Sequence, residues 1–408
     1  MQVTAFGILY FSILLYIFVR KDTKKIIYFT LLSMTLQCDN VVVLGDKGVG
    51  PQIFSSLSIV FYTFLAIREK KLYSKLLLSH GLYTCFLVYI ILTDSDSITL
   101  NLFQIIIYLA CGYSLYNLGK IISGNELLKI ITNVIFFVLV IGPIQFLCSS
   151  MIIPKIILQP FFFNDSFSGA DVQFYYTFPY HRLFSTFMEP SFCSTFLVGA
   201  IFFILQIGDK RIPHFRAILS ILIIELILTF SSTGYAGLLV MLVFYVSKHL
   251  KGKYVPYYFV VILLGFLFYI VFKDSILNEV LFAKSQSSSA QAREWWNIAA
   301  LEAFNSNPLW GTGFQSVRAS SYLYSLLGET GIIGTSIYLS LSLSLYWPLL
   351  SKKTKKEFDM VNASRLFMLS VFICMAIACP DHNLCTFWFG FYIYSLNDYP
   401  QPADRFLL

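Results

Sequence analysis

Charged residues are scarce in this chain of 408 residues, because Asp, Glu, Lys and Arg together make up only 12% of it. Soluble globular domains carry about 25% charged residues, and they cannot bury a chain that is 57% hydrophobic. The composition therefore excludes a soluble globular protein. The net charge of +7 does not indicate nucleic-acid binding, because the basic residues cluster in short loops between apolar runs.

Ligands for metals and partners for disulfides are also scarce. The eight cysteines include no Cys-x-x-Cys pair and show no zinc-ligand spacing. Most of them lie inside apolar stretches, so we expect each to be a small buried hydrophobic residue. We predict that the protein uses no metal and no other cofactor. The first apolar segment, 3–19, lacks a basic leader and a cleavage site, so we expect no cleaved signal peptide.

Long apolar runs are abundant. Runs of about 17–25 residues are long enough to cross a hydrocarbon core roughly 30 Å thick. We predict an all-α fold, a polytopic membrane helix bundle of about 11–13 spanning helices, with residues 1–408 forming a single transmembrane domain. The predicted spans are 3–19, 26–44, 53–67, 76–93, 98–119, 130–150, 190–207, 217–231, 234–247, 255–272, 331–350, 363–379 and 384–397.

Lysine and arginine are distributed unevenly among the loops. With the loop 20–25 placed in the cytoplasm, 22 of the 29 basic residues fall on the cytoplasmic side, as the positive-inside rule requires. Two longer loops, 154–189 and 273–330, then lie on the outer side. The first is rich in aromatic residues, which are typical of a membrane interface. The second contains a predicted amphipathic helix, 292–304, that ends before Asn307 and Pro308.

The outer loops hold three arginines, Arg182, Arg293 and Arg318, although the orientation of the chain does not need them there. A guanidinium group stays charged and offers a planar set of donors suited to phosphate oxygens. Two of these side chains facing each other would fit a pyrophosphate. The alternative is that each arginine reaches toward lipid headgroups at the interface.

Two carboxylates and one histidine are further candidates. Glu189 precedes Pro190 at the start of a predicted span, where it either caps the helix or accepts a proton from a sugar hydroxyl. Glu329 allows the same two interpretations. The short outer turn 380–383 carries Asp381 and His382, which are either candidate catalytic groups or ordinary polar residues of a surface turn.

A glycine turn follows the predicted amphipathic helix. The N–H groups of Gly311 and Gly313 can contact a phosphate or a sugar, although the turn lacks the Lys-Ser/Thr pair of a nucleotide-binding loop. The alternative is a tight turn without a ligand. Further along, Gly331 and Gly334 enter the next span, where small residues permit close helix packing.

Taken in order, these motifs resemble those of a bacterial family, the O-antigen polymerases and ligases. The motifs are Arg182-x6-Glu189-Pro-Ser191, then Arg293-x-x-Trp296 followed by Asn307-Pro-Leu-x-Gly-x-Gly-Phe314, and lastly Glu329-Thr-Gly-Ile-Ile-Gly334. The ligase pattern has a histidine followed by Asn, Ser or Gln, then nine residues, and then Gly-x-x-Gly. Ser320 and Ser321 occupy those two positions here, so the resemblance favours a polymerase over a ligase.

The resemblance implies a GT-C-like, metal-independent glycosyltransferase in the bacterial inner membrane, with both long loops in the periplasm. Its substrates would be undecaprenyl-pyrophosphate-linked oligosaccharides in the lipid bilayer, and a chain-length regulator protein is a further expected partner. Arg182 and Arg293 would stabilise the leaving pyrophosphate, and Glu189 or His382 would accept the hydroxyl proton. The residues expected to contact the substrate are His181, Trp296, Gly311, Gly313, Arg318, Ser320 and Glu329.

Two alternatives to the polymerase stay open. A ligase would transfer finished polymer to the lipid A–core, and the missing histidine argues against it. A flippase or other transporter would place paired charges or Gly/Pro-broken helices at the middle of the membrane, and the sequence shows few of either.

Overall fold

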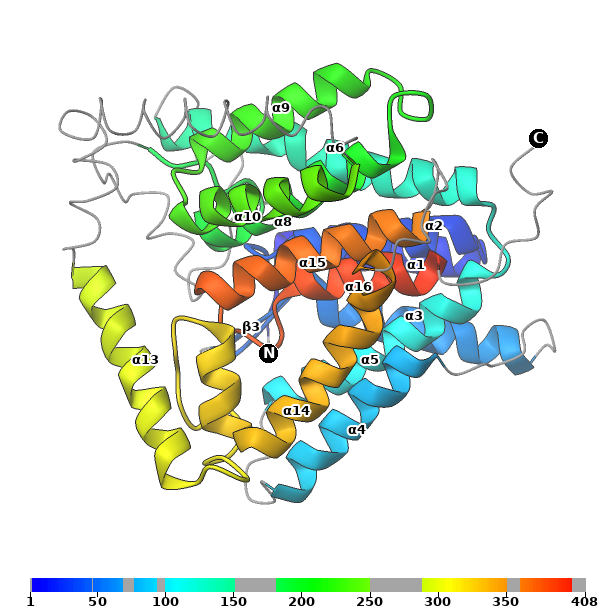
Figure 1. The fold of residues 1–408 in the computed structure, drawn as a ribbon. Coiled ribbons are helices and arrows are strands. Elements are labelled where there is room, and N and C mark those ends of the chain that lie inside the picture. Colours follow the sequence, from blue (N-terminus) through cyan, green and yellow to red (C-terminus); the bar gives the residue numbers. More distant parts are fainter. Residues whose placement is uncertain are drawn as a thin grey trace, which may run out of the picture.

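The structure is a bundle of helices, as the apolar runs predict. The computed structural model describes residues 2–45, 47–68, 77–93, 100–150, 181–249, 288–350 and 360–397. In Figure 1, several of the helices run side by side while α13 stands across one end of them. The helices are α1 (Ala5–Val19), α2 (Thr23–Thr35), α3 (Pro51–Arg68), α4 (Leu78–Thr93), α5 (Leu100–Gly119), α6 (Gly124–Ser149), α8 (Pro190–Ile207), α9 (Phe215–Leu228), α10 (Ser232–His249), α13 (Ser288–Ser306), α14 (Tyr322–Leu350), α15 (Met360–Ala378) and α16 (Cys385–Asn397).

These helices confirm the predicted all-α, multi-pass membrane bundle. Five of them, α5, α6, α8, α14 and α15, are long and apolar enough to cross a membrane, and α1, α3, α4 and α10 are shorter apolar helices. The predicted spans within the described residues fall on helices, with one partial exception. The predicted span 255–272 and most of the loop 154–189 lie outside the described residues.

The exception is the predicted span 26–44, which is wrong in its second half. The helix ends at Thr35, and β2 (Val42–Leu44) pairs antiparallel with both β1 (Gln2–Val3) and β3 (Lys47–Val49). Residues 37–40 carry amide and carboxyl side chains, which cannot face lipid without bonding partners. The valines that follow suit a strand because they are β-branched.

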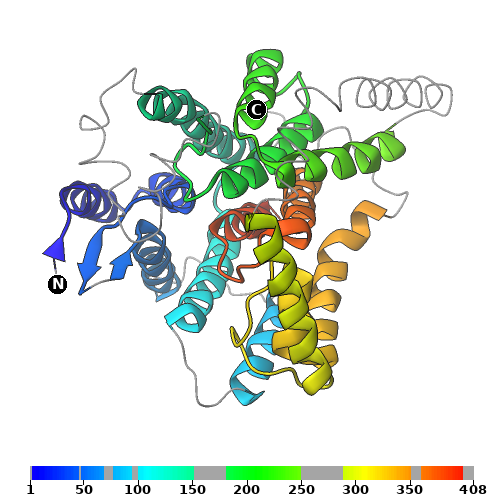
Figure 2. The same ribbon diagram turned by 90° about the vertical axis from the view of Figure 1, so that its left-hand side faces the viewer.

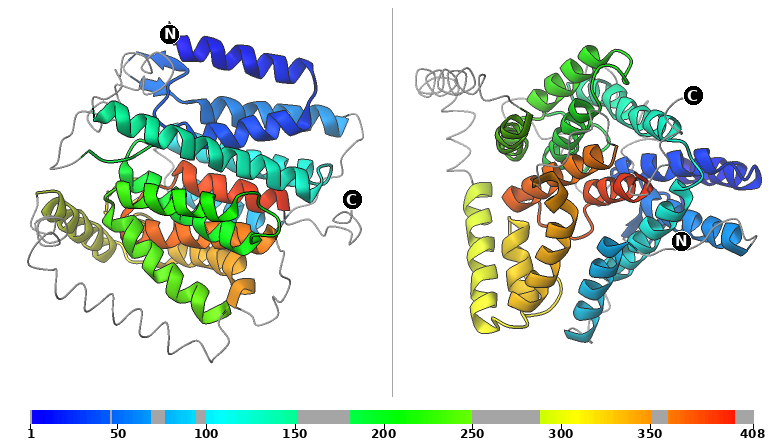
Figure 3. Two further views of the ribbon diagram at one scale, coloured as in Figure 1. Left: turned by 90° about the horizontal axis from the view of Figure 1, so that it is seen from above. Right: turned by 45° about the vertical axis from the view of Figure 1, so that its right-hand side comes forward.

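The central helix of the bundle is α8. Its side chains are buried on almost every side, as expected of a helix that is apolar all round. The ring of Phe196 packs 5.7 Å from that of Phe367 on α15 and 5.2 Å from that of Phe389 on α16. From above, the dark blue α1 lies at the edge of the bundle, and α6 lies between the blue and the green helices (Figure 3). Because α8 begins at Pro190, this central packing also fixes the position of Glu189.

Basic loops gather at one end of the bundle. Lys24 forms an ion pair with Glu126, and Arg211 donates to the Asn125 side chain at 3.3 Å. These contacts confirm that loops assigned to the same side of the membrane by their charge lie at the same end of the bundle. That this end faces the cytoplasm stays a prediction. We call it the basic end, and it holds the loops 20–22, 120–126 and 208–214.

The opposite end carries the candidate residues. The N–H of Gln37 donates to the Thr186 carbonyl at 2.9 Å, and the Ser194 hydroxyl donates to the Ser231 hydroxyl at 2.9 Å. Figure 2 looks at the molecule from this side and shows α13 in front of α14. We call it the site end, and it holds the segments 37–40, 181–189, 229–231, 307–321 and 380–383.

Two glycine-containing segments at the site end bind each other through their backbones. The Gly313 N–H donates to the Glu329 carbonyl at 3.0 Å. Gly331 has φ 60° and ψ −166°, which interrupts the helical backbone of α14, and a Cβ at this position would lie 2.5 Å from the Leu309 carbonyl. Glycine is therefore required at 331 both for the backbone angle and for the close approach.

The substitution Gly331→Ala tests this double requirement. Gly208 is a matched control, because its φ is also positive, at 81°, but its added Cβ would meet nothing within 4 Å. We expect Gly208→Ala to cost about 1–3 kcal/mol through backbone strain alone, and Gly331→Ala to cost about 1–3 kcal/mol more through the clash. Thermal unfolding of the purified protein in detergent measures both, and equal losses would contradict the interlocked backbones.

Candidate functional site

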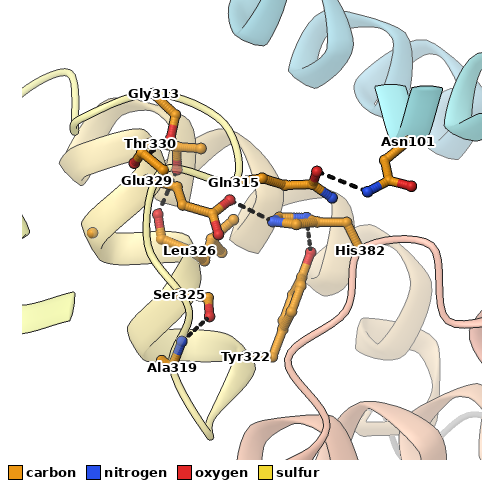
Figure 4. A network of polar contacts seen from close by, with 12 residues as sticks. Asn101, Gly313, Gln315, Ala319, Tyr322, Ser325, Leu326, Glu329, Thr330 and His382 are labelled. Atoms are coloured by element: carbon orange, nitrogen blue, oxygen red, sulfur yellow. Dashed lines mark hydrogen bonds and ion pairs between the residues drawn. The ribbon is translucent and has the colours of Figure 1, made fainter. Parts of the chain in front are cut away.

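The His382 side chain is bonded through both of its ring nitrogens (Figure 4). Nε2 lies 2.9 Å from Glu329 Oε2, and Nδ1 lies 3.0 Å from the Tyr322 hydroxyl oxygen. The His382 and Glu329 side chains are only 2% and 4% exposed. With Glu329 ionised, Nε2–H donates to the carboxylate and Nδ1 accepts from Tyr322. These two bonds fix the orientation and the tautomer of the imidazole.

Backbone bonds of the glycine turn position this network. We predicted that the N–H groups of Gly311 and Gly313 contact the substrate. In the structure they donate to the carbonyls of Asn307, at 2.9 Å, and Glu329, at 3.0 Å. The Gly311 bond closes its own turn, the Gly313 bond holds the backbone that carries Glu329, and Glu329 in turn holds His382.

Arg182 is fixed against the C-terminal end of α9. Its Nε donates to the Thr229 carbonyl at 2.9 Å, and its Nη2 donates to the Phe230 carbonyl at 3.2 Å. A cation is favoured there, because the carbonyls at the end of a helix carry partial negative charge. Arg182 and the preceding His181 are both half-buried. Arg182 thus lies at the site end, and its pairing with Arg293 in one pocket stays a prediction.

Glu189 is the N-cap residue of α8, but its side chain makes no capping bond. Its Oε2 instead accepts from the Ser191 hydroxyl at 2.9 Å, and the residue is exposed. Pro190 occupies the first turn, as the sequence predicts. The carboxylate is therefore held near a helix N-terminus, where negative charge is favoured, and it is accessible to a ligand.

Asp381 lies half-buried in the turn between α15 and α16. Burial raises the pKa of its carboxyl; the positive charge of Arg318 lowers it, Glu189 and Glu329 raise it further, and His382 lowers it. Three carboxylates, a guanidinium and an imidazole thus share one electrostatic environment. Within the part of the chain that the structure describes, no three His, Cys, Asp or Glu side chains converge as a metal site requires.

The helix α13 is tied to the loop that carries Arg318. The Arg318 guanidinium carbon lies 5.0 Å from the centroid of the Trp296 ring, a cation–π contact. The Asn297 side chain accepts from the Ser320 N–H at 2.9 Å. Arg293 precedes Trp296 by about one helical turn and is half-buried. The predicted residues Trp296, Arg318 and Ser320 are therefore brought together.

A group of carboxamides beside His382 was not predicted. Asn383 Nδ2 donates to Gln104 Oε1 at 3.1 Å and to Asn101 Oδ1 at 3.4 Å, and Asn101 Nδ2 donates to Gln315 Oε1 at 2.9 Å. Figure 4 shows Gln315 reaching toward Asn101 on α5. These residues lie up to 282 positions apart in the chain, so no local sequence pattern connects them.

This geometry defines the class of protein, which is a multi-pass membrane bundle with arginines and carboxylates at one end. The family model described as O-antigen ligase matches residues 217–341, which include Arg293, Arg318 and Glu329. The match confirms the resemblance to the O-antigen ligase and polymerase-like family over that part of the chain. No curated protein matches the chain.

The buried Glu329–His382 pair generates a stability prediction. Replacing His382 with Ala leaves a buried carboxylate without its partner, which costs about 1–3 kcal/mol. We expect the double variant Glu329→Ala/His382→Ala to lose less stability than the sum of the two single variants, because the residues interact directly. Unfolding in detergent of the wild type, the two single variants and the double variant gives the four stabilities of this double-mutant cycle.

His80 supplies the control for that cycle. It is equally buried, but its Nε2 lies 3.3 Å from the Ser395 hydroxyl, and no carboxylate in the described part of the chain bonds to it. The stability losses of His80→Ala and Glu329→Ala should simply add. If the stability losses of Glu329→Ala and His382→Ala also add, the contact between these two residues contributes nothing specific to stability.

Proposed function

We propose that the protein is a polysaccharide polymerase of the O-antigen type, in the bacterial inner membrane. It transfers an undecaprenyl-pyrophosphate-linked glycan to the terminal sugar hydroxyl of a second lipid-linked repeat unit, on the periplasmic side. One observation carries this proposal: Glu189, Asp381 and Arg318 converge at one end of a membrane bundle, in a chain whose residues 217–341 match the O-antigen ligase family. A chain-length regulator is a further proposed partner.

The reaction needs a stabilised leaving group and a proton acceptor. The bond between the anomeric carbon and a pyrophosphate oxygen breaks, the acceptor hydroxyl oxygen forms the new glycosidic bond, and its proton passes to a carboxylate. Arg182, Arg293 and Arg318 are the proposed donors to the pyrophosphate, because guanidinium groups bind phosphate oxygens through paired N–H groups. In this proposal they do so without a metal ion.

The geometry favours a carboxylate over His382 as the proton acceptor. Both nitrogens of His382 are bonded within the protein, so its proposed role is to position the turn that carries Asp381. Glu189 is accessible and is one candidate. Asp381 is the stronger candidate, because burial raises the pKa of its carboxyl, and a base is most effective when its pKa lies near the working pH.

A ligase remains the nearest alternative. Ser320 and Ser321 stand where the ligase pattern has its histidine and the polar residue after it, and both are buried. The Ser321 hydroxyl donates to the Ala376 carbonyl at 2.6 Å, so it joins α14 to α15 instead of facing a substrate. This difference supports the polymerase. Linkage analysis of surface polysaccharide after gene deletion separates the two, because loss of a ligase leaves long chains that are not attached to the lipid A–core.

One observation favours a transporter as the second candidate. Glu225, on α9, is 1% exposed, and neither of its carboxyl oxygens has a hydrogen-bond partner among the residues that the structure describes. It packs against Gly142 of α6, next to Pro143 inside that helix. Ionisable groups in a membrane interior commonly mark transport pathways. Untranslocated lipid-linked repeats accumulating in a deletion strain would favour this alternative.

Arginine variants test the polymerase directly. Arg182→Ala and Arg293→Ala should each lower the rate by about 10²–10³-fold, as does loss of one donor to a developing charge. Long chains should disappear from a gel of surface polysaccharide while single repeats persist. Lysine should rescue poorly, because an ammonium group cannot form the paired contact.

Arg211→Ala is the matched control, since Arg211 lies at the basic end. It should keep the normal ladder. Normal chain length in a stably expressed Arg293→Ala variant would count against the proposal.

The pH dependence tests Asp381 as the base. The base must be ionised to accept a proton, and the pKa of Asp381 is raised. Polymerisation should therefore decline on acidification at a pH above the usual range for aspartate. Asp381→Asn should lower the rate at every pH and abolish the decline on acidification. Asp22→Asn, at the basic end, should leave that decline unchanged. Rates in membrane vesicles across pH measure this, and a decline persisting in Asp381→Asn would exclude Asp381.

A further inference from the structure

We propose that the side chains of Asn101, Gln104, Gln315 and Asn383, which we call the carboxamide cluster, bind the terminal sugar ring of the acceptor. The ligand class is a neutral sugar whose ring hydroxyls both donate and accept hydrogen bonds. This inference rests on the proposed polymerase function and assigns to it a binding subsite of its own.

Mutual hydrogen bonds orient the four amide groups. Asn383 donates to Asn101 and Gln104, and Asn101 donates to Gln315. The Gln315 Nε2 and Asn383 Oδ1 atoms take no part in these bonds. Gln315 is exposed and Asn383 is half-buried, so one donor and one acceptor of fixed orientation face accessible space. Neighbouring sugar hydroxyls need this combination, which a carboxamide supplies through its NH2 and carbonyl groups.

The cluster borders the proposed proton acceptor. Asn383 is two residues after Asp381 in the same turn, and Gln315 follows Phe314, whose ring lies 4.9 Å from that of His382. Figure 4 shows Gln315 beside His382, on the side facing Asn101. A sugar bound to the amides would therefore have its reacting hydroxyl near Asp381.

Gln315 occupies a backbone position that would suit glycine better. Its φ is 58°, in the left-handed region, which costs most residues about 1–2 kcal/mol. The turn closes through the Ser316 N–H and the Gly313 carbonyl, at 3.2 Å, and that bond does not involve the Gln315 side chain. A glutamine at such a position is consistent with a side chain that serves binding rather than folding.

The absence of charge in the carboxamide cluster distinguishes this subsite from that of the donor. All four of its side chains are neutral amides, which suit the uncharged sugar of the acceptor. The pyrophosphate of the donor needs guanidinium groups instead. Arg318 interacts with Asp381, so a pyrophosphate bound to Arg318 would lie near the proposed proton acceptor.

The variant Gln315→Gly tests the subsite without a folding penalty. It removes the amide and also relieves the positive φ, so the melting temperature should stay equal or rise. Vesicles containing the full-length protein would receive long-chain lipid-linked donor at a fixed saturating concentration and labelled single-repeat lipid-linked acceptor at varied concentrations. We expect the KM for the acceptor to rise roughly three- to tenfold, as for one lost hydrogen bond, with kcat changed less than twofold.

Asn383→Ala should raise the same KM, and Asn125→Ala, which removes an amide at the basic end, should leave it unchanged. If wild-type vesicles extend chains and both Gln315→Gly and Asn383→Ala keep the wild-type KM, the subsite is wrong while the polymerase stands. If wild-type vesicles extend no chains, the polymerase proposal itself fails.

Discussion

The site end depends on the backbone hydrogen bonds that join residues 307–313 to residues 328–333. These bonds require glycine at 331, because a side chain there would overlap the Leu309 carbonyl. They set the backbone of Glu329, whose carboxylate holds His382. The turn of His382 also carries Asp381 and Asn383. A backbone constraint in one loop therefore positions polar side chains in a turn that follows two helices later.

Positive charge at the site end is held in place by protein groups. Carbonyls at the end of α9 bind Arg182, and the ring of Trp296 lies under Arg318. Held charges of this kind need little reorganisation when a substrate develops negative charge. On the predicted orientation, these arginines also lie on the side that membrane insertion disfavours for basic residues. Their position is thus better explained by binding than by topology.

The sequence predicted the spans well because the length of an apolar run is a local property. It failed at 36–44, where Gln37, Asp39 and Asn40 are buried and the backbone N–H of Gln37 donates to the carbonyl of the distant Thr186. The candidates Arg182 and Arg318 were found because the outer loops hold few arginines, and Glu189 was found because it precedes Pro190 at the start of a predicted span. The carboxamide cluster and the two bonds of His382 were not predictable, since they depend on tertiary contacts between residues 53 to 282 positions apart.

The interior of the bundle also controls the site. Glu225 and Arg182 are linked through α9: the Glu225 carboxyl packs against Gly142, while one turn later the Thr229 carbonyl accepts from Arg182. The Glu225 carboxyl is buried at this contact. Only a residue without a side chain leaves room for it on α6. A shift of α9 would disturb this contact and move the carbonyls that hold Arg182, so helix packing inside the membrane determines where the guanidinium group lies at the site end.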